Sequence, residues 1–500
     1  MLQTRAAMEG AAGTRLADVL GTLSSAADLA AGVPTETSLR VCVLSTTLAV
    51  RLGLCAQQQH DAYYAGLLRH LGCTGLSHEA GSLSGGDDHA SQRLIEALDL
   101  SQHAEPEQRR MIAALRGVCQ QALSLASDLG MSEGVVRVLG QLHERFDGRG
   151  IDGLQGDGVD SVARALHVAM LTETLYRQGG WNRVTEELER RSGAQLDPAI
   201  CALVLADSSH FLPLLNASSL WDAFLDAEPC GPAQISADQL DTVALAFARY
   251  TDLKCPIMLG HSPAVSALAV QAASIDGLDA ELIPGLRHAG LLHDLGLASV
   301  PNGILEKPAP LTALEWERLR LHAYFTDRIL ARLPAFAWVA RVAGFHHERV
   351  DASGYPRGVS PAATDRAARL LACADSYQAL IETRYHRGAL EPIAAANVLR
   401  TQAREGSLCA RSVDAVLAAA GHDDSTPRPR PTRPLPAGLT PREAEVLVQV
   451  ARGYTSKEVA TQLAVSTRTV QHHLEHIYAK LGVSTRAAAA LFAVRNELLG

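Results

Sequence analysis

Runs of residues with helical hydrophobic periodicity fill most of the chain and alternate with glycine-containing loops. Alternating β-branched residues, which mark half-buried strands, form no comparable run. The pattern therefore predicts an all-α fold. Composition agrees, because aromatic residues make up only 4% of the chain and its cores must be built mostly from Ala, Leu and Val. Such cores favour helices over strands.

Three sequence blocks recur in the same order, which indicates an internal repeat. "AGLLRHLG" (65–72) matches "AGLLHDLG" (289–296), and "HERFDGRGIDG" (143–153) matches "HERVDASGYPRG" (347–358). "SVARALHVAMLTETLYR" (161–177) matches "RAARLLACADSYQALIE" (366–382). We interpret these blocks as two tandem copies of one helical unit, at residues 37–210 and 240–420, with a connector at 211–239. Residues 1–36 are expected to be a loosely attached leader.

A segment rich in proline and arginine, residues 421–438, separates the second copy from a C-terminal module at 439–500. Its alternating prolines remove backbone donors and fix φ, so it should be an extended, semi-rigid linker. Residues 425–500 carry ten Lys and Arg against five Asp and Glu, a net +5, whereas the whole chain carries −9 and the remainder therefore −14. A basic module on an acidic body predicts a polyanionic partner for the C-terminus.

The cysteines and the apolar runs limit the class of protein. Nine cysteines occur without a C-x-x-C pair, which argues against a disulfide framework and a thiolate zinc site. No uncharged apolar run reaches the length of a membrane span, and the N-terminus "MLQTRAAMEG" lacks a signal-peptide core. We therefore expect a cytoplasmic protein with no membrane partner.

The second copy collects histidines and acidic residues at the edges of its loops and helices. Neutral imidazoles with carboxylates and no thiolate suit Fe, Mn, Zn or similar ions rather than a structural zinc. A carboxylate can bridge two ions, and Asp294 is the natural candidate. Any one of these histidines alone would be a hydrogen-bonded structural residue, so the prediction depends on the whole set: His261, His293, Asp294, His322, His346, His347 and Asp375.

Residues 257–400 resemble the HD-GYP branch of the HD phosphohydrolase superfamily. The resemblance lies in "HDLG", "ILEKPAPLTALEWE", "HHERVDASGYPRG" and "ADSYQALIETRYHRG". That family is all-helical and hydrolyses cyclic di-GMP, commonly with a di-iron centre. The resemblance implies two divalent transition-metal ions, Fe or Mn, and a cyclic dinucleotide or related nucleotide. It also implies the ligand sets: His261, His293, Asp294 and Asp375 for one ion, and Asp294, His322, His346 and His347 for the other.

The motif Gly354-Tyr355-Pro356 is expected on the substrate side of this site. Gly354 would allow a close approach of the backbone. Tyr355 offers a ring for a base or a hydrogen bond to a phosphate, and Pro356 stiffens the turn. Taken alone, these three residues are also typical of an ordinary surface turn.

One position departs from the family in a way that bears on catalysis. The family motif is H-D-x-G-K, but Leu297 stands where the lysine is expected. The metal ligands are complete, with Asp294 as the bridging catalytic residue, whereas a cation near the substrate is missing. Two interpretations therefore stay open: hydrolysis of a nucleotide, and a non-catalytic sensor of nucleotide and metal.

The first copy lacks the corresponding residues. Thr37, Arg69, His70, Leu142 and Met170 stand where the second copy has His261, His293, Asp294, His346 and Asp375. This copy is either a sensory or dimerising pseudo-domain or a structural half that buries apolar surface of its twin.

The C-terminal module is predicted to form four short helices. Thr440 and Glu443 form a capping box with Pro441 at the first helical position, and Ser456 and Ser466 are the expected caps of the next two helices. A tight turn between two helices, the second with a donor-rich outer face, is helix-turn-helix geometry.

This module resembles the LuxR-type DNA-binding domain from end to end. The pattern T-V-x-x-H-L-x-x-I-x-x-K-L-G-V runs from Thr469 to Val483, and the recognition helix is expected at 466–479. The resemblance implies binding to double-stranded DNA, and by a homodimer, because LuxR-type modules bind as pairs. The candidate DNA-binding residues are Lys457, Ser466, Arg468, Thr469, Gln471, His472 and Lys480. We therefore expect a transcription regulator that carries an HD-GYP-like dinuclear metal domain.

Overall fold

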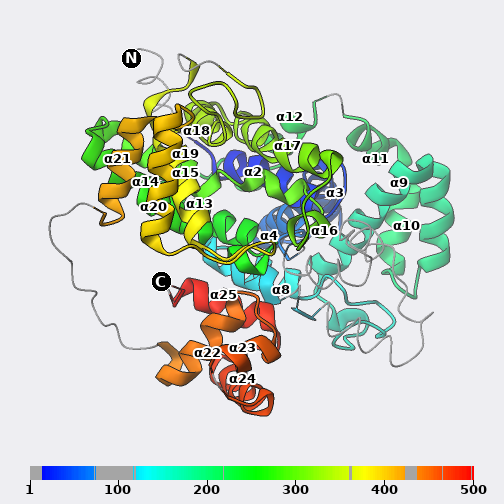
Figure 1. Ribbon diagram of the computed structural model, residues 1–500. Coiled ribbons are helices and arrows are strands. Elements are labelled where there is room, and N and C mark those ends of the chain that lie inside the picture. Colours follow the sequence, from blue (N-terminus) through cyan, green and yellow to red (C-terminus); the bar gives the residue numbers. More distant parts are fainter. Residues whose placement is uncertain are drawn as a thin grey trace. The chain divides into compact units, whose positions relative to one another are not determined.

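The computed structural model describes residues 14–72, 74, 116–117, 120–217, 219–359, 363–422, 436–463, 465–496 and 498–499. Every named element in these residues is a helix, and the β-type contacts among them are isolated bridges (Figure 1). The predicted all-α fold is confirmed. The predicted linker lies mostly in residues 423–435, outside the described residues.

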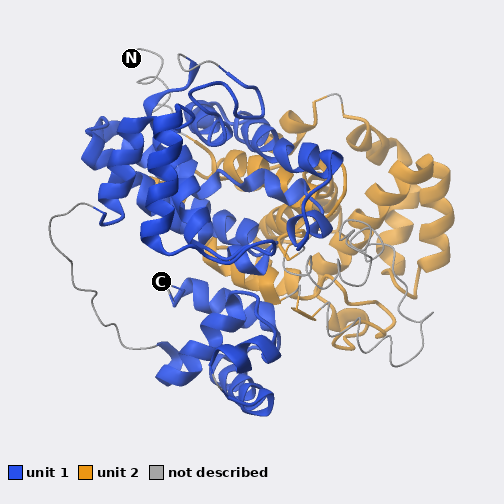
Figure 2. Cartoon of the chain, viewed as in Figure 1, with its two compact units in different colours: residues 1–10, 77–87, 243–500 blue, residues 11–76, 88–242 orange. Residues whose placement is uncertain are grey.

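The chain divides into two compact units (Figure 2). The described residues from 14 to 242 form unit 2, and those from 243 to 499 form unit 1. The division falls inside α13 (Ala237–Asp252). Each unit has its own buried core.

Unit 2 is built around α3, which packs against α4 and α9. Its helices are α2 (Leu16–Ala30), α3 (Thr37–Arg51), α4 (Ala56–Leu68), α8 (Glu133–Gly140), α9 (Ser161–Arg191), α10 (Pro198–Ala206), α11 (Ser208–Leu215) and α12 (Leu220–Asp226). The expected connector contains α12, whose Phe224 is buried and stacks on Tyr63 with ring centroids 5.2 Å apart.

The expectation of a loosely attached leader is wrong for the residues that the structure describes. Helix α2 packs against α3 and α4, and Leu20 and Leu23 on it are fully buried. Its serines and alanines are buried as well. Because such small side chains contribute little to a pattern of large apolar residues, hydrophobic periodicity does not predict this helix.

Unit 1 places α14 at its centre, against α15, α19 and α21. The helices of its larger part are α14 (His261–Asp276), α15 (Ile283–Leu292), α16 (Asn302–Leu305), α17 (Ala313–Leu330), α18 (Ala337–Gly344), α19 (Arg366–Ile381), α20 (Pro392–Glu405) and α21 (Ala410–Ala419). Helix α17 packs against α18. These contacts bring the ends of α14, α15 and α18 to the same region as the middle of α17 and α19.

The C-terminal part of unit 1 consists of the four predicted short helices: α22 (Pro441–Ala451), α23 (Ser456–Gln462), α24 (Thr467–Leu481) and α25 (Arg486–Arg495). The capping box of Thr440 and Glu443 is present, and Ser466 caps α24 as expected. The cap of α23 is Thr455 rather than Ser456, because Thr455 forms its own capping box with Glu458.

The internal repeat recurs in the local structure of the two units. In unit 2 the Asp28 carboxylate accepts from the backbone and hydroxyl of Ser38, and in unit 1 Asp252 does the same for Ser262. A buried glutamate after the repeated histidine likewise accepts two backbone N–H groups from the following loop in each unit. The matched sequence blocks therefore build matched structures.

Among the described residues, no single helix is both long and apolar enough to cross a membrane, although the bent pairs α10–α11 and α24–α25 meet that criterion together by length and composition.

A glycine in each unit allows two helices to cross closely. A Cβ atom on Gly290 of α15 would lie 2.6 Å from the Ser266 Cα of α14. The Gly66 position of unit 2 is similar, with the Cys42 Cα at 2.9 Å. Neither contact leaves room for a methyl group without a shift of the backbone.

We predict that Gly290→Ala destabilises the protein, although alanine is the better helix former by about 1 kcal/mol. Overpacking against α14 costs typically about 1–3 kcal/mol and outweighs that gain. The measurement is the free energy of unfolding in denaturant. Gly388→Ala is the control, since its added Cβ meets nothing within 4 Å. Equal stabilities of the two variants would contradict the prediction.

Candidate metal centre and DNA-binding face

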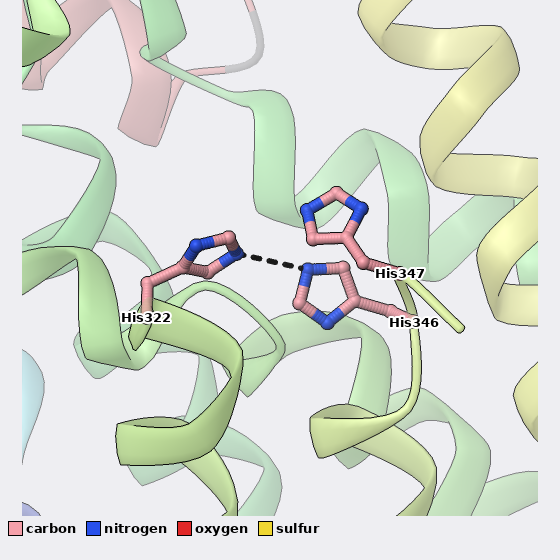
Figure 3. Close-up of side chains that lie close together, drawn as sticks. All are labelled: His322, His346 and His347. Atoms are coloured by element: carbon pink, nitrogen blue, oxygen red, sulfur yellow. Dashed lines mark hydrogen bonds between the residues drawn. The ribbon is translucent and has the colours of Figure 1, made fainter. Parts of the chain in front are cut away.

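The seven predicted metal ligands come together in unit 1. His261 begins α14, His293 and Asp294 follow α15, His322 lies on α17, and Asp375 lies on α19. His346 and His347 follow α18, and Figure 3 shows them facing His322. All are buried except His347, which is partly buried. Three overlapping groups of these residues place their ligand atoms close enough to hold an ion.

The two carboxylate oxygens of Asp294 face different histidines. Its Oδ2 lies 3.5 Å from the His293 Nε2 and 3.8 Å from the His261 Nε2. Its Oδ1 lies 3.4 Å from the His322 Nε2 and 3.6 Å from the His346 Nε2. This is the arrangement that a bridging carboxylate requires.

Asp375 and His347 complete the two groups. The Asp375 Oδ1 lies 3.3 Å from the His261 Nε2 and 3.8 Å from the His293 Nε2. Its Oδ2 lies 3.8 Å from the His347 Nδ1. The His322 and His346 Nε2 atoms are 3.2 Å apart (Figure 3). The donors thus cluster on either side of Asp294.

Backbone carbonyls orient three of the rings. The Nδ1 atoms of His293, His322 and His346 each donate to the carbonyl three residues earlier, at 2.8, 2.6 and 2.6 Å. Each Nε2 is then left with a lone pair that points into the cluster. The buried His293 Nε2 has no hydrogen-bond partner, as expected of an atom placed for an ion.

Burial and charge favour the metal-binding ionisation states of Asp294 and of three histidines, whereas the Glu382 carboxylate, acting against burial, raises the pKa of His261 well above its usual value. Burial lowers the pKa of His322 to about 4 and lowers those of His293 and His347 as well, so these imidazoles are neutral near pH 7. Burial alone would raise the pKa of Asp294, but the surrounding histidines outweigh it and hold that pKa well below its usual value. The residues therefore fit a divalent transition-metal centre.

The loop with Gly354, Tyr355 and Pro356 lies directly against the centre. A Cβ on Gly354 would lie 2.5 Å from the His347 carbonyl oxygen, so this position requires glycine. The Tyr355 ring lies beside the His347 ring, with centroids 4.6 Å apart and the planes tilted by 33°, and the Tyr355–Pro356 peptide is cis. Glu348, which sequence analysis did not single out, accepts from the backbone N–H groups of Arg357 and Val359 at 2.8 and 3.1 Å.

Leu297 occupies a small apolar cluster. It is buried with Val300 and Ile304, and Met258 and Leu319 pack against them. The position of the expected lysine is therefore filled by hydrocarbon packing rather than by another polar group.

The corresponding region of unit 2 is arranged differently. The His70 Nδ1 lies 3.1 Å from the Asp28 Oδ1, and the Arg69 guanidinium contacts the His70 Nε2. Thr37 donates to the Pro34 carbonyl. Among the described residues, the groups able to hold a metal all lie in unit 1.

A second residue that sequence analysis missed is Glu382. Its carboxylate lies 2.8 Å from the His261 Nδ1, on the side of the ring that faces away from the cluster. The two residues are 121 positions apart, so spacing gives no signal for this pair.

The predicted DNA-binding face lies on α24. Val470, Leu474 and Ile477 are buried, whereas Arg468, Gln471 and His472 are exposed. Lys457, on α23, is exposed as well. The helix therefore presents a polar face of hydrogen-bond donors to solvent, as a recognition helix does.

Three other predicted DNA-binding residues have partners within the module. Ser466 accepts from the Thr469 N–H at 3.0 Å, and their side-chain oxygens are 2.7 Å apart. Lys480 donates to the Glu443 carboxylate at 2.7 Å and to the Gly438 carbonyl at 3.1 Å. These contacts give Lys480 a role in joining α24 to the capping box of α22.

Comparison with protein families agrees with both parts of unit 1. The family described as "HD domain" matches residues 246–408, and the family "Bacterial regulatory proteins, luxR family" matches residues 437–493. HD-type phosphodiesterase domains bind divalent metal ions.

Several curated proteins are similar to this chain. A 3'3'-cGAMP-specific phosphodiesterase 3 of Vibrio cholerae is 27% identical over 75% of this chain and 88% of its own length. A 3'3'-cGAMP-specific phosphodiesterase 1 of the same organism is 32% identical over 39% of this chain and 45% of its own. The transcriptional regulatory protein YhcZ of Bacillus subtilis is 47% identical over 12% of this chain and 29% of its own.

A solved structure shares the fold. The crystal structure of a cyclic GMP-AMP specific phosphodiesterase of V. cholerae matches with a TM-score of 0.58 and 24% identity, over 82% of this chain and 98% of its own. That coverage extends well beyond residues 246–408, which the HD family model matches.

We predict that Glu348→Gln loosens the loop beside the centre, because an amide nitrogen replaces one of the two carboxylate oxygens that accept from the N–H groups of Arg357 and Val359. Loss of one such bond costs about 1–3 kcal/mol. Hydrogen exchange of the Arg357 or Val359 amide should accelerate by about tenfold or more. Glu317→Gln, which changes an exposed carboxylate, is the control. Unchanged exchange in the Glu348 variant would rule out this anchoring role.

Proposed function

We propose that this chain, which matches the HD domain family and the luxR family of bacterial regulatory proteins, is a transcription regulator that hydrolyses a cyclic dinucleotide at a dinuclear metal centre. The observation that carries the proposal is the Asp294 carboxylate, with one oxygen turned to each group of histidines.

Each ion has a defined set of ligands. The first would be held by His261, His293, Asp294 and Asp375, and the second by Asp294, His322, His346 and His347. Nitrogen and oxygen donors without thiolate favour Fe or Mn. Two such ions supply Lewis-acid polarisation of a phosphodiester and a nucleophile at neutral pH.

The residues of the chain prepare the site for that chemistry. Backbone carbonyls keep the Nε2 atoms directed inward, so little reorganisation is needed when an ion binds. Tyr355 offers an aromatic face beside His347 for a base of the substrate. The names of the similar phosphodiesterases support a cyclic dinucleotide as that substrate.

A second candidate function is nucleotide sensing without turnover. The observation that favours it is Leu297, whose packing with Val300 and Ile304 leaves no cation at the position of the family lysine. Binding and hydrolysis of cyclic GMP-AMP and cyclic di-GMP, measured side by side on the metal-loaded protein, separate the two functions. Binding without product supports the sensor, and product formation supports the enzyme.

DNA binding would use the exposed side of α24. Arg468, Gln471 and His472 are directed away from the buried stripe of that helix and suit the base edges of the major groove. Lys457, exposed on the preceding helix, suits the phosphates. Two chains bound as a homodimer would recognise an inverted repeat.

We predict that the wild type takes up about two Fe²⁺ or Mn²⁺ ions per chain and that Asp294→Ala loses most of both, because one bridging carboxylate serves each ion. Elemental analysis after dialysis measures this. Asp279→Ala, an exposed aspartate in the same unit, should retain full metal content. A wild type that takes up neither ion would overturn the proposed centre.

The DNA-binding model predicts separable effects of two substitutions. Lys457→Ala should weaken binding to all sequences alike and make the log-salt slope shallower by about one. Gln471→Ala should cost about 1–3 kcal/mol on the preferred site and little on random DNA.

Fluorescence anisotropy over a range of salt concentrations measures both effects. Lys307→Ala is the control, since its ammonium lies outside the C-terminal module and is paired with Glu315, so the slope should stay unchanged. If Gln471→Ala leaves sequence preference intact, the docking of α24 is wrong.

A further inference from the structure

The ring of His261 lies between two carboxylates. Its Nε2 faces the cluster, 3.3 Å from the Asp375 Oδ1. Its Nδ1 faces outward, 2.8 Å from the Glu382 Oε2. Both nitrogens are therefore occupied, one by the metal side of the site and the other by a buried acceptor.

Helix α19 provides both carboxylates from one face. Asp375 and Gln378 lie on the helix, and Glu382 is its C-terminal cap residue. Gln378 is three residues after Asp375, and Glu382 is four residues after Gln378. Such spacings place side chains on the same side of a helix. One helix thus positions the His261 ring from both ends.

Other partners hold Glu382 in place. The Gln378 side chain donates to its Oε1 at 2.7 Å, and the Arg384 guanidinium lies 3.0 Å from its Oε2. This contact places a positive charge beside the carboxylate, whose side chain is only 19% exposed. Glu382 is therefore fixed before any ion binds.

His261 differs in this respect from the other oriented histidines. His293, His322 and His346 donate their Nδ1–H to neutral backbone carbonyls. A carboxylate acceptor makes an imidazole a more basic ligand than a carbonyl does. The two groups of ligands on either side of Asp294 are therefore chemically unequal.

The first copy of the repeat supports a link between this glutamate and the metal. In the block at 161–177, Arg177 stands at the position of Glu382, and it pairs with Glu173. The same copy has Thr37 at the position of His261, so no ring is present there to orient. The copy without the ligand histidine also lacks the outer carboxylate.

We infer that Glu382 is a positioning residue that makes the ion beside His261 the more tightly bound of the two. This inference rests on the proposed dinuclear centre. Partners of this kind typically contribute about 10–100-fold to metal affinity. The ion beside His322, His346 and His347 would bind more weakly and exchange more readily.

The test is a titration of the metal-free full-length protein with Mn²⁺ in competition with a chromophoric chelator. The wild type should show two unequal sites. Glu382→Ala should weaken the tighter site by about 10–100-fold and leave the other unchanged. Glu382→Gln keeps a hydrogen-bond acceptor but removes the charge, so its affinity at the tighter site should lie between those of the wild type and Glu382→Ala.

Glu405→Ala, an exposed glutamate at the end of α20, is the control and should match the wild type. Co²⁺ at one equivalent provides a second readout. It should fill the tighter site first, so its absorption bands should change in the Glu382 variants if the ion moves away from the His261 side. Circular dichroism identifies an unfolded Ala variant, in which case the Gln variant decides.

The outcomes separate the two proposals. A wild type that binds no metal overturns the centre itself. If the wild type binds two ions and the Glu382 variants bind both as tightly as the wild type does, the role of Glu382 is overturned and the centre stays intact. Weakening of both sites to the same extent also overturns it, because the inference requires a selective effect.

Discussion

A buried carboxylate, Asp294, surrounded by four imidazole nitrogens is the interaction on which the rest of unit 1 depends. An ionised carboxylate is costly to bury unless positive charge or a metal compensates for it. The ends of α14, α15 and α18 and the middle of α17 converge on this carboxylate and supply its histidine neighbours. The scaffold and the centre therefore cannot be considered separately.

The two copies show what happens to this scaffold when the centre is absent. Unit 2 keeps the aspartate–serine contact, the buried glutamate and the close helix crossing. Where unit 1 has His293, unit 2 has Arg69, whose guanidinium lies against His70. The fold of the repeat thus tolerates replacement of the centre by contacts among Asp28, Arg69 and His70.

The candidate ligand set could be predicted from sequence because the seven residues together match a family pattern, although each histidine alone could equally be a structural residue. The all-α fold and the four C-terminal helices followed from periodicity and caps. Contacts between distant residues were not accessible: Glu382 meets His261 across 121 positions, and Lys480 meets Glu443 across 37. Helix α2 was missed for a different reason, since half of its buried residues are alanine or serine. Periodicity detects large apolar side chains and is insensitive to close packing of small ones.

The hydrogen bonds from three histidines to backbone carbonyls have a consequence for how the centre can change during evolution. A carbonyl group is present whatever the side chain, so no single substitution deletes the acceptors at positions 290, 319 and 343. The orientation of these rings is robust to mutation. His261 depends instead on a side chain, and one nucleotide change at codon 382 can weaken or remove its support. Variation in metal affinity among descendants of this chain would therefore arise first on the His261 side, while the opposite side stays constant.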